Sequence, residues 1–428
     1  MGISIGNPVA VGDIVRLGAA SHGVIVGQQR HIFEWSDFAK TRASEGAAVD
    51  LRIGWAYYDV ATPHPGVNVP RVLPDNTMLI EGSATNRNDL GSQDMTGWAL
   101  DGTPLLSLVA GPDGGAATAT RIEDDDGAAT EGIYNDLVTV IGTAYAVHAK
   151  VKKDSDVSRF VALAVVESGT GAASRALQIN TSTGAVVDYG ADAFSTLVVL
   201  SAGDWWHVSA SYDAVGTAAQ AILQPAAGTV WGVASVAATG AAIFSDFQLE
   251  AVGTAPPSAP SSPIRTSVAA VVRQPDIANL VLTAAQAVRF QDPGGFWFDF
   301  WSGASSVDVD PGGGNKTLFD VGVALLRLYR TSGTSTWQFQ VNTIISTAWT
   351  GSAWNRGDHF RVWVSCPVGS AARIQMWNIT QGLASGIFTH AQSAVDLTGQ
   401  GLQISGYYPS PTGFQYSAVY SLPIVGAP

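Results

Sequence analysis

A strict alternation of apolar and polar side chains runs over residues 203–212, which read Gly-Asp-Trp-Trp-His-Val-Ser-Ala-Ser-Tyr. Successive side chains of an extended strand point to opposite faces, so a period of two places alternate residues on one side. The side predicted to enter a core carries Trp206, Val208, Ala210 and Tyr212. A sheet with one buried face is therefore the expected setting of this segment.

The pattern returns at residues 357–365, which read Gly-Asp-His-Phe-Arg-Val-Trp-Val-Ser. When the two segments are aligned on Gly-Asp, the residues predicted to face inward are Phe360, Val362, Val364 and Cys366. Matching parity after the same Gly-Asp turn predicts two β-sandwich modules, each built around an equivalent central strand.

The composition favours an all-β chain with little helical surface. Charged residues make up only 13% of the 428 residues and 47 residues are glycine, which suits many turns and short apolar strands. A surface poor in charge also suits packing against copies of the same chain or within a larger assembly.

Charge and cysteine content disfavour several classes of function. The formal net charge of −13 repels phosphate backbones, so nucleic acid is not an expected partner. The single cysteine, Cys366, excludes a disulfide within the chain and a metal site built from cysteines. We find no basic segment followed by an apolar core at the start, and no apolar run of membrane-spanning length. The expectation is a soluble chain without a recognisable Sec signal.

Four segments are expected along the chain. Residues 1–77 combine short strands, glycine turns and a proline-rich connector, which predicts an N-terminal attachment or oligomerisation segment. Residues 78–253 alternate short strands with turns and predict a jelly roll. Residues 254–276 open with four prolines among small residues and predict a stiff linker. Residues 277–428 predict a second β-sandwich, in which residues 318–330 are expected to form one strand.

Short motifs follow one another through residues 78–253. They are Gly82-Ser-Ala-Thr-Asn, Gly111-Pro-Asp-Gly with Ala117-Thr-Ala-Thr-Arg-Ile, Ala144-Tyr-Ala-Val-His-Ala-Lys, Asp204-Trp-Trp-His-Val-Ser and Phe247-Gln-Leu-Glu. In this order, and before a proline-rich exit, they resemble the carbohydrate-binding-like jelly rolls of bacteriophage virion proteins. Residues 87–89 read Arg-Asn-Asp where that pattern usually has leucines, so the first strand is expected to end early.

Residues 277–428 are similar to concanavalin-A-like or laminin-G-like sandwiches, through their strand order and the repeated Gly-Asp strand. Together the two resemblances imply a tail fibre, a head spike or the equivalent part of a phage-like gene transfer agent. Such a protein is synthesised in the bacterial host cytoplasm, is located in the virion and contacts other virion proteins through its N-terminal segment. The resemblance further implies a homo-oligomer, with a trimer favoured, that mediates adsorption by binding host surface polysaccharide.

Two alternatives stay open beside adsorption. One is a purely structural virion component, such as a capsid decoration or baseplate protein, and the other is a capsular polysaccharide depolymerase. The seven histidines show no metal-binding spacing, and neither a Gly-x-Ser-x-Gly motif nor a phosphate-binding loop before a helix occurs. We therefore expect binding without turnover and assign no catalytic residue.

Aromatic residues of the second module are the candidate glycan contacts. In residues 295–301 the alternation puts three phenylalanines on one face and Trp297, Asp299 and Trp301 on the other. Sugar faces stack on aromatic rings while carboxylates accept hydrogen bonds from hydroxyls, although these tryptophans could instead pack against the second sheet or a neighbouring subunit. A second group, from expected loops, comprises Trp349, Trp354, Tyr407, Tyr408, Phe414 and Tyr416. For that group, recognition of a glycan or partner and burial between subunits both remain open.

No cofactor is expected, with calcium at acidic turns as the one alternative. Residues 123–126, Glu-Asp-Asp-Asp, precede Gly127, and Asp308 and Asp310 form a similar pair. Calcium prefers clustered oxygen ligands, but neither segment has the spacing of a dedicated calcium loop. No metal ligand is assigned.

Overall fold

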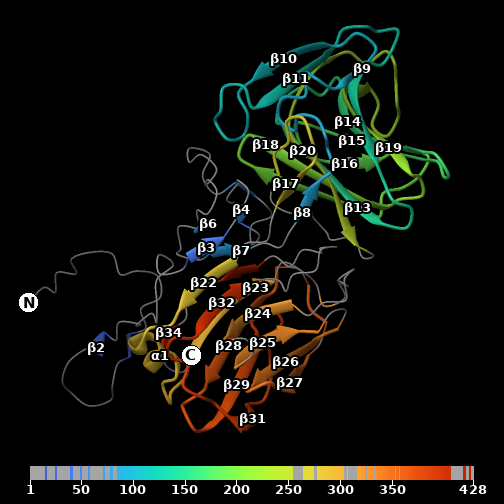
Figure 1. The fold of residues 1–428 in the computed structure, drawn as a ribbon. Coiled ribbons are helices and arrows are strands. Elements are labelled where there is room, and N and C mark those ends of the chain that lie inside the picture. Colours follow the sequence, from blue (N-terminus) through green and yellow to red (C-terminus); the bar gives the residue numbers. More distant parts are fainter. Residues whose placement is uncertain are drawn as a thin grey trace, which may run out of the picture.

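The computed structural model shows two β-sandwiches in tandem (Figure 1). It describes residues 84–253, 264–273, 277–302, 306, 316–322, 325–331, 334–351, 353–355 and 357–405, and the backbone of short strands outside these ranges. Neighbouring strands of the four large sheets pair antiparallel, which confirms the predicted all-β fold. Among the described residues no helix is long and apolar enough to cross a membrane.

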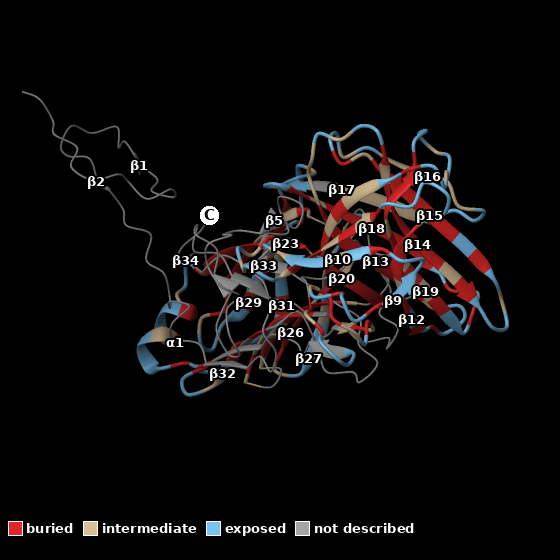
Figure 2. Ribbon diagram, turned by 90° about the horizontal axis from the view of Figure 1, so that it is seen from above, coloured by how far each residue is buried: buried red, intermediate tan, exposed pale blue. Residues whose placement is uncertain are grey.

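The first sandwich consists of two six-stranded sheets. Its strands are β9 (Ala99–Asp101), β10 (Leu105–Val109), β11 (Ala119–Asp124), β12 (Gly132–Val138), β13 (Ala144–Lys152), β14 (Phe160–Ser168), β15 (Ala173–Ile179), β16 (Val186–Asp188), β17 (Thr196–Ala202), β18 (Trp205–Asp213), β19 (Ala218–Gly228) and β20 (Gly240–Gly253). The sheets have the orders β10-β11-β20-β13-β18-β17 and β16-β15-β14-β19-β12-β9. Central strands β13 and β14 are buried along most of their length, whereas the edge strand β9 is exposed (Figure 2).

The second sandwich consists of a seven-stranded and a nine-stranded sheet. Its own strands are β22 (Ile277–Val281), β23 (Phe296–Ser302), β24 (Lys316–Val321), β25 (Leu326–Arg330), β26 (Thr336–Val341), β27 (Ile344–Thr350), β28 (His359–Ser365), β29 (Ala371–Asn378), β30 (Leu383–Ala384), β31 (Phe388–Ser393), β32 (Gly401–Ser405), β33 (Ala418–Tyr420) and β34 (Ile424–Val425). The orders are β27-β26-β25-β24-β32-β22-β3 and β30-β29-β28-β23-β33-β7-β6, with β31 paired to β29 and β34 to β23.

The two Gly-Asp strands occupy comparable places in the two sandwiches. β18 lies between β13 and β17, and β28 lies between β29 and β23. Val208, Ala210 and Tyr212 enter the first core with Trp206 packed against it, and Phe360, Val362, Val364 and Cys366 enter the second. The predicted parity is confirmed. The glycines before the strands, Gly203 and Gly357, have φ angles of 57° and 86°, a conformation that favours glycine.

Strands from the N-terminal part of the chain belong to the second sandwich. β3 (Ala39–Thr41) pairs with β22, and β6 (Arg71–Val72) pairs with β7 (Met78–Ile80), which pairs with β33. The boundary between residues 77 and 78 is corrected accordingly, because a sheet edge accepts any strand with free backbone groups, however distant in sequence. The strands β1 (Val15–Arg16) with β2 (Ile25–Val26), and β4 (Val49–Asp50) with β5 (Ala56–Tyr57), form separate two-stranded pairs.

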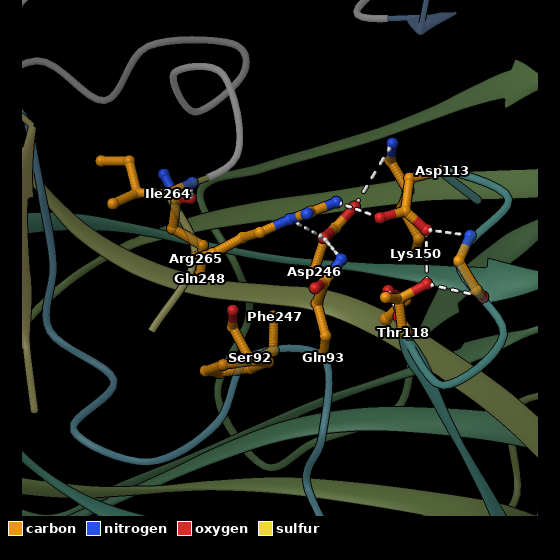
Figure 3. A network of polar contacts seen from close by, with 12 residues as sticks. Ser92, Gln93, Asp113, Thr118, Lys150, Asp246, Phe247, Gln248, Ile264 and Arg265 are labelled. Carbon is orange, nitrogen blue, oxygen red and sulfur yellow. Dashed lines mark hydrogen bonds and ion pairs between the residues drawn. The ribbon is translucent and has the colours of Figure 1, made fainter. Parts of the chain in front are cut away.

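Part of the predicted linker is anchored to the first sandwich. The Ile264 backbone N–H donates to Gln248, and the Arg265 guanidinium pairs with Asp113 and lies 4.0 Å from Asp246 (Figure 3). β8 (Ala84–Asn86) also pairs with β21 (Val271–Arg273). The extent of residues 254–276 as a free linker is therefore corrected, and residues 254–263 with their four prolines lie outside the described residues.

Three local features test the expected strand limits. β8 ends at Asn86, as the departure at residues 87–89 predicted. Residues 318–330 form two strands, β24 and β25, separated at Gly322, whose φ of 60° turns the chain. A helix that the strand pattern did not predict, α1 (Ala284–Phe290), begins at a capping box in which Thr283 and Gln286 bond to each other's backbone N–H.

Candidate functional site

The outer face of the nine-stranded sheet brings together tryptophans and charged side chains from three adjacent strands. β23 pairs with β28 so that Trp297, Asp299 and Trp301 lie opposite Trp363, Arg361 and His359. On the other side of β28, Arg361 lies opposite Trp377 of β29. We call this set, together with Arg373 and Gln375 of β29, the indole–guanidinium face.

Alternation along each strand separates this face from the core. Phe296, Phe298 and Phe300 of β23 enter the core, so Trp297, Asp299 and Trp301 point away from it. The same holds for β29, whose core residues are Ala372, Ile374 and Met376. The predicted grouping of Trp297 with Asp299 and Trp301 is confirmed.

An ion pair lies at the centre of the face. Arg361 Nε donates to Asp299 Oδ1 at 2.7 Å and Arg361 Nη2 donates to Asp299 Oδ2 at 2.9 Å. The Arg361 guanidinium also lies 4.3 Å from the centre of the Trp297 ring. This fork geometry, stacked on an indole, fixes a long side chain that would otherwise be mobile.

His359 extends the charged cluster towards Trp301. Its Nε2 lies 3.3 Å from Asp299 Oδ2, and its ring stacks on Trp301 with centroids 4.4 Å apart. Burial alone would raise the pKa of Asp299, but hydrogen bonds from Arg361 and His359 and the positive charge of Arg361 outweigh it, so the pKa lies below its usual value. The hydrogen bond to Asp299 raises the pKa of Arg361. Asp299 is therefore a carboxylate at neutral pH.

Exposure is uneven across the face. Trp297 and Asp299 are each 9% exposed, and Trp363 packs with Trp297 in a small cluster. Trp301, His359, Arg361 and Trp377 are half-buried, and Arg373 is exposed. Asp299 does not stand open between the two indoles, because Arg361 bonds to both of its oxygens. The accessible parts of the face therefore belong to Trp301, His359, Arg361, Trp377 and Arg373.

Gly295 lies where the backbone passes close to this face. Its φ is 79°, and an added Cβ would lie 2.4 Å from the Val364 carbonyl oxygen and 2.6 Å from Trp363 Nε1. The indole of Trp363 in turn donates to the Gly294 carbonyl at 2.9 Å. Because glycine has no Cβ, the backbone can pass in contact with the Trp363 indole, which belongs to the face.

Replacing Gly295 by alanine is expected to lower the free energy of unfolding of the second sandwich by roughly 2 kcal/mol and to displace Trp363. Gly357→Ala is the matched control, because that φ is 86° and nothing lies within 4 Å of an added Cβ, so only backbone strain of about 1 kcal/mol remains. Denaturant unfolding followed by tryptophan fluorescence measures both. Equal losses would show that the close approach at Gly295 is unimportant.

The second candidate group does not join this face. Trp354 is only 2% exposed and stacks on Trp337 in the core, so its assignment to an accessible loop is corrected. Ring contacts with Trp337 and Phe360 hold it there, and the Arg330 guanidinium lies over its ring, 5.2 Å from the centre. Trp349 lies on β27 of the other sheet and packs partly against the core. Four further predicted residues, Tyr407, Tyr408, Phe414 and Tyr416, lie outside the described residues.

The acidic turn at residues 123–126 is occupied by the chain's own donors. Asp124 accepts from the backbone N–H groups of Asp126 and Glu131, and Glu131 accepts from Thr103 and from the Asp125 N–H. No group of three or more His, Cys, Asp or Glu side chains with metal-binding geometry occurs among the described residues. The second acidic pair, Asp308 and Asp310, lies outside them.

Sequence reasoning did not name six residues of the face: His359, Arg361, Trp363, Arg373, Gln375 and Trp377. The first three alternate with Phe360, Val362 and Val364, so the parity of the Gly-Asp strand already placed them on an outer face. Their pairing with β23, at sequence separations of 58 to 66 residues, is what brings them close to Asp299, and no local sequence pattern shows that pairing.

Comparisons with known proteins match this chain to solved structures of low sequence identity. No family model and no curated protein matches the chain. The tandem CBM22 domains of Paenibacillus barcinonensis Xyn10C are 10% identical over 80% of this chain and 95% of theirs, with a TM-score of 0.26. Mouse laminin α1 domains LG4-5 are 12% identical over 74% of this chain and 91% of theirs, with a TM-score of 0.21.

A CBM22 xylanase fragment of Clostridium thermocellum complexed with xylohexaose is 18% identical over 41% of this chain, with a TM-score of 0.25. The match spans only 29% of that fragment. Scores this low do not carry a ligand or an activity from those proteins to this chain.

Proposed function

We propose that the chain is a fibre or spike subunit of a bacteriophage virion or phage-like gene transfer agent, and that it binds polysaccharide on the host cell surface. The observation that carries the binding part is the indole–guanidinium face, with Trp301 and Trp377 half-buried on either side of the Asp299–Arg361 pair. The virion setting rests on the resemblance of the ordered motifs in residues 78–253.

The chemistry of the face suits sugars. Indoles pack against the C–H faces of pyranose rings, and guanidinium N–H groups donate to ring and hydroxyl oxygens. Because Asp299 and the Trp297 ring hold Arg361 in place, little side-chain entropy is lost on binding. Each contact is weak, so display of several copies on one particle supplies the avidity. Recognition needs no turnover.

A purely structural virion role is the second candidate, and one observation favours it. Among the strands that the structure describes, β10 is the edge strand of its sheet, and it carries Leu105 and Leu108, which are 54% and 41% exposed. Exposed edges with apolar side chains pair readily with other chains. Assembly contacts through β10 and glycan binding through the second sandwich are compatible, so the binding assay below decides the role.

Trp301→Ala and Trp377→Ala are each expected to weaken polysaccharide binding by the full-length protein roughly tenfold, because each removes one stacking surface. Trp231→Ala is the matched control, since Trp231 is an exposed tryptophan of the first sandwich. A glycan array identifies the ligand and biolayer interferometry compares the variants, with circular dichroism to verify folding. If the wild type binds no glycan, the structural role is favoured. If all three variants lose affinity equally, the indole–guanidinium face is not the binding site.

A further inference from the structure

We propose that the polysaccharide recognised by the indole–guanidinium face is acidic, with carboxylate groups that bind Arg373 and the edge of Arg361. This inference rests on the proposed function and specifies its ligand. It starts from the charges of the face: two guanidinium groups and His359 stand against a single carboxylate, Asp299. The two guanidinium groups and the one carboxylate give the face a formal charge of +1 before His359 is counted.

This sign is opposite to that of the whole chain, whose formal net charge is −13. On a molecule of that charge, an anionic polymer is repelled by most of the surface and attracted to a cationic region. The charge of the whole chain opposes an anionic polymer, so only the local positive charge of the face favours an acidic ligand, and it determines where such a ligand binds.

Arg373 is the group best placed to receive a carboxylate. It is exposed, and none of the ion pairs found among the described residues involves it. Its guanidinium lies 5.7 Å from the centre of the Trp363 ring, and its Nη2 lies 3.4 Å from Ser365 Oγ. Stacking on an indole orients the planar fork, which matches the two oxygens of a carboxylate.

Asp299 does not oppose such a ligand. Arg361 bonds to both of its oxygens, so its charge is compensated within the face. Arg361 is half-buried, with 31% of its side chain exposed, and retains an accessible edge beside Trp377.

The spacing of the groups implies a chain of sugars. Arg373, Gln375 and Trp377 alternate on the outer side of β29. Four residues of extended strand span about 13 Å, which exceeds one pyranose ring, so a ligand that stacks on Trp377 and reaches Arg373 contains several sugars. Gln375 lies between them with its Nε2 donating to the Ser385 carbonyl at 3.1 Å.

The test compares each acidic polymer with its own neutral derivative. Binding of the full-length protein is measured to polygalacturonate and alginate, and to the same polymers after reduction of their carboxyl groups to alcohols. The wild type is expected to bind the acidic forms at least tenfold more tightly, and added salt is expected to reduce that preference. Arg373→Gln is expected to lose roughly tenfold in affinity for the acidic forms and to keep its affinity for the reduced forms.

Arg121→Gln is the control, because it removes a positive charge from the first sandwich, where Arg121 pairs with Glu123. Equal binding of acidic and reduced polymers by the wild type overturns the inference while leaving glycan binding in place. An equal loss in Arg121→Gln and Arg373→Gln also overturns it, since net charge alone would explain the effect. Absence of binding to all four polymers counts against both the inference and the proposed function.

Discussion

Asn86→Ala is expected to lower the free energy of unfolding of the first sandwich by on the order of 4 kcal/mol. Asn86 is fully buried and makes four hydrogen bonds to the backbone. Its Nδ2 donates to the carbonyls of Phe247 at 3.1 Å and Ile264 at 2.8 Å. Its Oδ1 accepts from the N–H groups of Asn88 at 3.0 Å and Leu249 at 3.1 Å.

The effect is large because truncation leaves all four backbone groups buried without their partner. The side chain joins three segments distant in sequence: β8, β20 and the segment that follows residues 254–263. Loss of Asn86 is therefore expected to release Ile264 as well as to weaken β20.

Thermal unfolding of the full-length protein measures the change, with an expected fall of about 10 °C in the Tm of the first sandwich. Hydrogen–deuterium exchange followed by mass spectrometry locates the destabilised region. The largest increase in exchange rate is expected in peptides that cover β20. Val138→Ala is the control, because Val138 is exposed on β12 and its truncation is expected to change stability by less than about 0.5 kcal/mol. A Tm for Asn86→Ala within 2 °C or so of the wild type would refute this account.

Acidification from pH 6.5 to about 4 is expected to destabilise the first sandwich by about 3 kcal/mol through His148. Burial lowers the pKa of His148 from 6.5 to about 4, against the opposing effects of Asp246 and Gln248. The unfolded chain takes up a proton below pH 6.5, whereas the folded chain resists it until about pH 4. Stability therefore falls as the pH falls through this window, and below it the group contributes no further loss.

The geometry explains why the proton is resisted. His148 Nδ1 lies 2.6 Å from His207 Nε2, and both rings are buried on the outer side of the sheet formed by β13 and β18. Lys150 lies two residues along β13, and burial lowers its pKa to about 7, so in this window it is protonated 3.6 Å from Asp246. Arg265 lies in the same network (Figure 3). Burial of the ring away from solvent is the cause that opposes a proton on His148.

Thermal unfolding between pH 4 and 7 compares the wild type with His148→Gln, which keeps hydrogen-bonding capacity and does not titrate. Carboxylates such as Asp299 also lose stabilisation in acid, so the informative quantity is the difference in slope between the two proteins. The variant is expected to show the shallower slope. Identical slopes would mean that His148 does not control acid stability.

Much of the fold followed from local patterns. Alternation at residues 203–212 and 357–365 predicted which side chains enter each core, and alternation at residues 295–301 predicted that Asp299 shares a face with two tryptophans. Both are local properties of an extended backbone. The ends of strands are harder to predict from local patterns. The sequence predicts one strand over residues 318–330, because an apolar run does not show where a turn interrupts it.

The candidate site was only partly predictable. The sequence predicts a loop position for Trp354, yet Trp337 and Phe360 from other strands bury it. Asp299 was expected to be open to a ligand because its partner, Arg361, lies 62 residues away. The origin of such misassignments is the same: a side chain's surroundings come from segments that are remote in the chain.

For this protein the sequence alone determined the class of structure, the presence of two sandwiches and the face on which each strand residue lies, because these depend on the geometry of single strands. The tertiary structure decided which strands are neighbours. It placed β7 in the second sandwich, anchored Ile264 to the first and set Arg361 beside Asp299. Strand pairing depends on the closure of long loops and on which sheet edges can accept a partner. Neither can be predicted from a local sequence pattern.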